Sequence, residues 1–209
     1  MSILGAESTG KTTLASEVAQ QLQREGHDVA LVSEYLREFC DTHGRTPLVH
    51  EQAGIAAEQA RRIASAAQTH ELVIADTSAL TIAVYSEQVF GDTSLYGAAI
   101  EAQRVHALTL LMALDLPWVA DGLQRDGPHV RAPTDALLRA ALQRGGIGYT
   151  VVSGSGAARS EAALRAVRHA LQSPSALDEV TANPPWRRMC ERCGDGDCER
   201  HAFLLPRGR

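Results

Sequence analysis

A short segment near the start of the sequence limits the possible folds more than any other feature. Residues 5–12 read GAESTGKT and fit the pattern G-x-x-x-x-G-K-[ST] at every fixed position. The segment SIL (2–4), which resembles the end of a buried strand, precedes this pattern, and apolar residues spaced four apart follow it within 11–25. A strand, a glycine-rich loop and an amphipathic helix in this order are the setting in which the pattern forms a phosphate-binding P-loop.

The residue types of this loop suit a nucleoside triphosphate. Backbone N–H groups and the positive end of the helix dipole attract phosphates. We expect Lys11 to reach the β- and γ-phosphates of ATP and Thr12 to ligate Mg²⁺. A glycine-rich turn that only begins a helix is the alternative, and it leaves the complete match unexplained. The predicted ATP-binding residues are Gly5, Ala6, Glu7, Ser8, Thr9, Gly10, Lys11, Thr12 and Thr13.

Lys11 is the only lysine among the 20 basic residues of the chain, and all the others are arginine. An ammonium group is compact and strongly hydrated, whereas a guanidinium is planar, so the two do not replace each other on a phosphate. The single lysine therefore lies where phosphate binding requires it. It also excludes a common GTPase switch, because the base-reading Asn-Lys-x-Asp motif of that class needs a second lysine.

Apolar strand-like segments alternate with helical patterns along the rest of the chain. Besides residues 2–4, the strand candidates are 28–33, 71–77, 107–114 and 148–154. Helical patterns cover 11–25, 51–69, 134–146, with Thr134 as its expected N-cap, and 158–172. Alternation of this kind predicts parallel strands joined by right-handed crossovers. We predict an α/β, three-layer P-loop nucleotide kinase fold with a five-stranded parallel sheet.

The character of the sequence changes after residue 172. The stretch 173–189 contains three prolines and no strong periodicity, and a Cys/His-rich tail follows it. We therefore expect a P-loop kinase domain at 1–172, and a linker with a tail at 173–209. The tail residues Cys190, Cys193, Cys198 and His201 suit a structural, tetrahedral Zn²⁺ site. The alternative is a disordered tail whose cysteines stay reduced.

Two carboxylates follow predicted strands, where ligands of parallel sheets bind. Asp76 ends the segment LVIAD, and we expect it to hold the Mg²⁺ shell, although a helix N-cap would also place an acid there. Glu34, in the segment SEYLREF, ends the second predicted strand and could orient, or take a proton from, an attacking hydroxyl group. Arg37 lies one turn later and could steady a phosphate or pair with Glu34. A helix start with a surface ion pair explains these two residues equally well.

The stretch 115–127 follows the fourth predicted strand, is polar and carries Arg125 near its end. Small-molecule kinases have a mobile lid at this place, whose arginine closes on the phosphoryl group. An ordinary surface loop is the alternative. Trp118 and Tyr35 could stack on a base or a pyridine ring, and simple packing would explain them as well.

The composition describes a globular chain without a strong charge. It has 209 residues, 44% hydrophobic content and a net charge of −5. This charge gives no general attraction to nucleic acid or to anionic membranes, and no apolar run is long enough to span a membrane. The P-loop begins too early for a signal peptide to precede it. We therefore expect a cytoplasmic protein whose partner is a small-molecule substrate, with no nucleic-acid or membrane partner.

Four segments together resemble a known family. GAESTGKTTL, SEYLREF, VIADTSALTIAVYSEQVFG and PWVADGLQRDG are similar, in order and spacing, to the nicotinamide riboside kinase domain of NadR-type NAD-salvage proteins, an AAA-type ATPase/kinase domain. The resemblance implies transfer of the ATP γ-phosphate to the 5′-hydroxyl of nicotinamide riboside. It implies catalytic roles for Lys11, Glu34, Asp76 and Arg125, and substrate contacts from Glu34, Tyr35, Arg37, Asp76, Trp118 and Asp121.

One departure from the family pattern concerns the lid. Where the family reads G-L-R, this chain has Gly122-Leu123-Gln124, and Arg125 comes one place later. Two other functions also agree with the sequence. The chain could be an ATP-binding P-loop regulator or ATPase, or a kinase for another nucleoside or metabolite.

Overall fold

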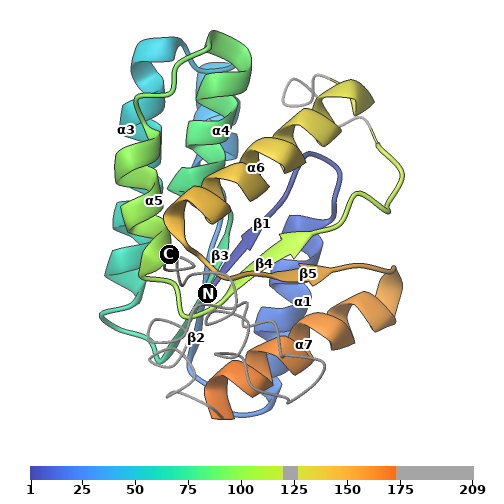
Figure 1. Cartoon of the computed structure of the whole chain (residues 1–209). Coiled ribbons are helices and arrows are strands. Elements are labelled where there is room, and N and C mark those ends of the chain that lie inside the picture. The colour runs from blue at the N-terminus through green and yellow to red at the C-terminus, as the bar shows by residue number, and fades with distance from the viewer. Residues whose placement is uncertain (120–126, 173–209) are drawn as a thin grey trace, which may run out of the picture. The chain divides into compact units, whose positions relative to one another are not determined.

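The computed structural model describes residues 1–119 and 127–172, in which one or two helices follow each strand (Figure 1). The strands are β1 (Ser2–Leu4), β2 (Val29–Val32), β3 (Leu72–Asp76), β4 (Thr109–Met112) and β5 (Thr150–Val152). The helices are α1 (Lys11–Arg24), α2 (Tyr35–His43), α3 (Gln52–Ala66), α4 (Ala79–Phe90), α5 (Tyr96–Arg104), α6 (Arg131–Gly145) and α7 (Gly156–Gln172). Short 3-10 turns, η1 (Val49–Glu51) and η3 (Pro128–Val130), precede α3 and α6.

The five strands form one parallel sheet in the order β2-β3-β1-β4-β5. β1 lies at the centre, where Ile3 pairs with Asp76 of β3 on one side and with Leu110 of β4 on the other. The chain crosses from β1 to β2 on one side and from β3 past β1 to β4 on the other, so a crevice opens beyond the carboxyl ends of β1 and β3. The predicted α/β fold with a five-stranded parallel sheet is confirmed.

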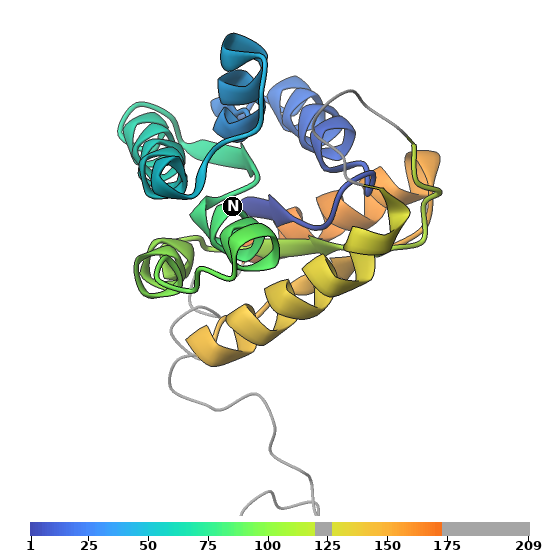
Figure 2. The ribbon, with the colours of Figure 1, turned by 90° about the horizontal axis from the view of Figure 1, so that it is seen from above.

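Alternate side chains of the central strands enter two separate cores. Ile3 and Leu110 pack with α1 and α7, whereas their neighbours Leu4 and Leu111 pack with α2, α3, α4, α5 and α6. Figure 2 shows the strands between these two groups of helices. The three predicted layers follow from the two-residue period of a strand, because successive side chains point to opposite faces.

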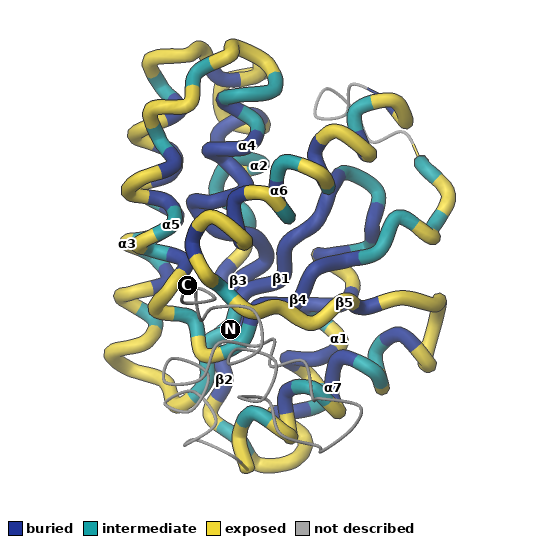
Figure 3. The backbone as a smooth tube through the Cα atoms, viewed as in Figure 1, coloured by how far each residue is buried: buried dark blue, intermediate teal, exposed yellow. Residues whose placement is uncertain are grey.

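Burial is greatest in the middle of the sheet (Figure 3). Every residue of β1 and β4 is buried, whereas Thr150 and Val151 of the edge strand β5 are exposed. The central strand β1, which ends at the crevice, is therefore buried along its whole length. Among the described residues, no helix is both long and apolar enough to cross a membrane.

Two differences from the predicted elements have physical causes. α6 begins at Arg131, and Thr134 lies inside its first turn instead of capping it, so that expectation was wrong. Pro133 is compatible with this earlier start because first-turn N–H groups have no partner within a helix. The periodicity also missed α4, which is buried on most sides and has no polar face to produce an amphipathic pattern.

Candidate functional site

The P-loop runs from the end of β1 to Lys11, the first residue of α1. Gly10, with φ of 77°, and Ser8, with φ of 52°, take the left-handed conformation that turns the chain into the helix. The buried Thr9 hydroxyl donates to the Ala6 carbonyl oxygen over 2.8 Å, and Lys11 Nζ donates to the same oxygen over 3.0 Å. These bonds hold the loop at the positive end of the α1 dipole, where a phosphate is favoured.

Thr12 and Asp76 meet at the centre of the crevice. The Thr12 hydroxyl donates to Asp76 Oδ2 over 2.6 Å, and the Asp76 side chain is only 3% exposed. Asp76 Oδ1 is also buried and has no hydrogen-bond partner in the described part of the chain. A hydroxyl and a carboxylate are the hard oxygen donors that Mg²⁺ prefers, so these two residues fit the expected ion. Asp76 is not a helix cap, because Ser78 caps α4 by accepting from Leu80 N–H.

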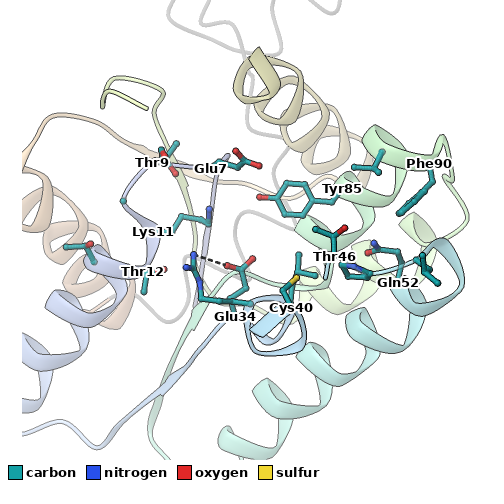
Figure 4. Close-up of a pocket in the computed structure, with 18 residues that line it drawn as sticks. Glu7, Thr9, Lys11, Thr12, Glu34, Cys40, Thr46, Gln52, Tyr85 and Phe90 are labelled. Carbon is teal, nitrogen blue, oxygen red and sulfur yellow. Dashed lines mark ion pairs between the residues drawn. The ribbon is translucent and has the colours of Figure 1, made fainter. Parts of the chain in front are cut away.

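Glu34 and Arg37 line the same cavity as Thr12. Glu34 immediately precedes α2, and Arg37 Nη2 lies 4.0 Å from its Oε2 (Figure 4). The ion pair of the sequence-based alternative is therefore present, and both side chains also line the crevice. A cavity of about 470 Å³ brings Thr12, Glu34, Arg37 and Asp76 together.

A second cavity, of about 350 Å³, extends from the P-loop into an apolar compartment (Figure 4). Residues 7–13 form its phosphate end, and Glu34 lies at its side. Its far end is built by α2, the segment 46–48, the first residue of α3 and the end of α4. The residues of that far end are Leu36, Cys40, Thr46, Pro47, Leu48, Gln52, Tyr85, Val89 and Phe90.

Tyr85 belongs to the far end of this cavity, and its hydroxyl points toward Lys11 and Glu7 in Figure 4. Burial raises the pKa of Tyr85 strongly, and the negative charges of Glu34, Glu7 and Asp76 raise this pKa further. The hydroxyl therefore keeps its proton and remains a hydrogen-bond donor. Reasoning from sequence missed Tyr85, Phe90 and Gln52, although Tyr85 and Phe90 lie on the helix that follows the Asp76 strand.

A family model described as an AAA domain matches residues 1–159. This chain belongs to the AAA domain family. The matched range of the AAA domain includes the P-loop, Glu34, Asp76 and every residue that lines the two cavities. Among curated proteins, no sequence match is found for this AAA domain.

Two solved structures show the same fold as this AAA domain. A NadR protein in complex with NAD and AMP-PNP is 18% identical with a TM-score of 0.64, and the match covers 82% of this chain and 49% of that one. A NadR protein in complex with NR is 19% identical with a TM-score of 0.66, covering 80% and 48%. The chain thus spans about half the length of these proteins. The resemblance to NadR-type proteins is confirmed for the fold, which is that of a P-loop, kinase-like nucleotide-binding domain.

The two aromatic side chains that were predicted to contact a ligand lie outside the two cavities. Neither Tyr35 nor Trp118 is among the residues that line the cavities. The Tyr35 ring packs under the Arg62 guanidinium, whose Cζ lies 4.3 Å from the ring centroid. Trp118 is half-buried beyond β4.

The other predicted residues, Asp121, Arg125, Cys190, Cys193, Cys198 and His201, lie outside the described residues. Within 1–119 and 127–172, no group of three or more His, Cys, Asp or Glu side chains could hold a metal ion.

The segment after β4 and the helix α7 both form hydrogen bonds with the P-loop of the AAA domain. Ser8 Oγ donates to the Val119 carbonyl oxygen over 2.8 Å and accepts from Val119 N–H over 3.1 Å. Arg159 of α7 donates from Nη2 to the Thr9 carbonyl oxygen over 3.0 Å and from Nη1 to Asp115 Oδ1 over 2.7 Å. This guanidinium holds the pKa of Asp115 below its usual range. The P-loop is therefore supported by two segments distant in sequence.

Proposed function

We propose that this chain is an ATP-dependent kinase that transfers the γ-phosphate of ATP to the 5′-hydroxyl of nicotinamide riboside, giving nicotinamide mononucleotide in NAD salvage. One observation carries this proposal: a single cavity joins the P-loop to an apolar compartment that contains Tyr85 and Phe90. A phosphate donor fits the first part, and a ribose with an aromatic ring fits the second. The similarity in fold to NadR proteins bound to NR and to AMP-PNP supports this assignment.

In the proposed site, the P-loop and Lys11 hold the triphosphate of ATP. Thr12 and Asp76 would hold Mg²⁺, which neutralises phosphate charge when it is bound. Lys11 is largely buried, so its ammonium acts in a medium that screens charge less than water does. These groups stabilise negative charge on the transferring phosphoryl group.

On the acceptor side, Glu34 orients the ribosyl hydroxyl and accepts its proton as the oxygen attacks the γ-phosphorus. The new bond joins this oxygen to phosphorus, and the bond from phosphorus to the β,γ-bridging oxygen breaks to release ADP. Tyr85 donates a hydrogen bond to the bound acceptor or to the phosphoryl group. We keep Arg125 as the proposed lid arginine and Arg37 and Asp121 as proposed acceptor contacts, whereas Tyr35 and Trp118, which line neither cavity, have no place in this proposal.

The test is an assay with ATP, Mg²⁺ and a panel of nucleosides that includes nicotinamide riboside. We expect ADP to form only when the acceptor is present, together with an equal amount of nicotinamide mononucleotide. ADP that forms at the same rate without any acceptor would indicate an ATPase or regulator instead. Turnover with a different nucleoside alone would keep the kinase and change its substrate.

A further inference from the structure

The far end of the acceptor cavity contains a buried amide without a partner. Gln52, the first residue of α3, is only 4% exposed and lines this cavity (Figure 4). Its Oε1 is buried and has no hydrogen-bond partner within the described ranges. A buried amide oxygen in this state is destabilising unless a ligand supplies the missing donor.

The other two buried glutamines of the described chain show what a structural amide looks like. Gln59 Oε1 accepts from Tyr35 N–H over 2.7 Å, and its Nε2 donates to the Ser33 carbonyl oxygen over 3.3 Å. Gln103 accepts from Ser78 Oγ and donates to two further hydroxyl groups, with distances from 2.7 to 2.9 Å. Gln52 differs from both because its oxygen remains unpaired and because it faces a cavity.

The backbone before Gln52 is held in place. Arg45 donates from Nη1 and Nη2 to the two Glu51 carboxylate oxygens, each over 2.7 Å. Leu48 N–H donates to Glu51 Oε2 over 2.7 Å. This arrangement closes the turn that leads into α3, so the Gln52 amide enters the cavity from a fixed backbone. A fixed polar group loses less conformational freedom when it binds a ligand.

Apart from Gln52 and the hydroxyl groups of Thr46 and Tyr85, the compartment is lined mostly by apolar side chains. Pro47, Leu48, Val89 and Phe90 contribute apolar side chains, and Thr46 contributes a hydroxyl group. An apolar wall binds a flat ring without fixing its orientation, whereas a buried hydrogen bond does fix it.

We propose that Gln52 determines acceptor specificity by hydrogen-bonding a planar carboxamide on the acceptor ring. The inference rests on the proposed function, whose acceptor carries such a group. A glutamine amide presents a donor and an acceptor side by side, so it can form two hydrogen bonds with a carboxamide. A carboxylate at the same place presents acceptors only and leaves the Gln52 oxygen unpaired.

The test compares nicotinamide riboside with nicotinic acid riboside in wild type, Gln52→Leu and the matched control Gln59→Leu. We expect wild type to prefer the carboxamide. Gln52→Leu should lower kcat/KM for nicotinamide riboside about 10- to 100-fold, mainly through KM. It should bring the ratio between the two acceptors close to one and leave the KM for ATP unchanged. Gln59→Leu should keep the wild-type ratio.

Thermal unfolding separates this role from a structural one. Gln52→Leu removes an unpaired buried group, so its Tm should equal or exceed that of wild type, whereas Gln59→Leu should lower Tm because it breaks two hydrogen bonds. An unchanged acceptor ratio in Gln52→Leu would overturn the proposal, with or without a lower Tm. Wild type that phosphorylates neither riboside would instead refute the proposed function, and this inference with it.

Discussion

The hydroxyl of Thr12 donates to Asp76 over 2.6 Å and thereby joins the first turn of α1 to the end of β3. If this pair holds Mg²⁺, Asp76→Asn should lower turnover by about 100-fold or more, because it removes the charge that faces the ion. It should also raise the Mg²⁺ concentration that gives half-maximal rate. A Mg²⁺ titration of the kinase assay measures both effects.

Asp135→Asn is the matched control for this substitution, since it removes a carboxylate that pairs with Arg139 on α6, outside the cavities. It should leave the Mg²⁺ dependence unchanged. A wild-type Mg²⁺ dependence in Asp76→Asn would argue against the assignment of the pair.

Lys11 is expected to tolerate no replacement, not even by arginine. Lys11→Arg keeps the charge, but it places a planar guanidinium where a buried ammonium reaches the Ala6 carbonyl oxygen. We expect turnover to fall by about 100-fold while the folded state persists. Steady-state kinetics and circular dichroism test the two parts. The control is Arg24→Lys in the last turn of α1, and rates for Lys11→Arg that match this control would contradict the prediction.

Gly5 has no space for a side chain. An added Cβ would lie 2.8 Å from Met112 Cβ and 3.0 Å from Thr9 Oγ1, and the φ of Gly5 is +156°. Gly5→Ala should therefore reduce the free energy of unfolding by about 1–3 kcal/mol and weaken ATP binding, because the loop must move away from β4. Urea unfolding and nucleotide titration measure the two effects.

Gly97→Ala in α5 provides the comparison, because nothing lies within 4 Å of its added Cβ. Alanine favours a helix by up to about 1 kcal/mol over glycine, so this variant should be as stable as wild type or more so. Equal stability of the two alanine variants would show that the contact with Met112 carries no strain.

His106 should make the stability depend on pH. Burial lowers the pKa of His106 to about 4, whereas the unfolded chain has the ordinary value near 6.5. Between these values the unfolded state binds the proton and the folded state does not, so stability falls as pH decreases from about 6.5 to 4. His106→Asn should flatten this part of the curve, as followed by urea unfolding at several pH values. An equally steep curve in the variant, as expected for the exposed control His169→Asn, would exclude His106 as the cause.

The P-loop could be predicted from the sequence because its residues are consecutive. Lys11 and Thr12 follow the loop directly, and Asp76 could be found because it ends an apolar run beside the central strand. The compartment that we propose for the acceptor comes from α2, α3 and α4, whose packing sets which side chains meet. Gln52 begins an alanine-rich helix and carries no signal in its neighbours. Only the three-dimensional structure shows that the Gln52 oxygen is unpaired, whereas the Gln59 oxygen accepts a hydrogen bond.

The contact between Arg159 and the carbonyl oxygen of Thr9 joins residues that are 150 positions apart. During synthesis on a ribosome, the P-loop emerges long before its partner in α7. At usual elongation rates the delay is roughly ten seconds or more. A nascent chain therefore carries a phosphate loop that lacks this support until α7 has emerged.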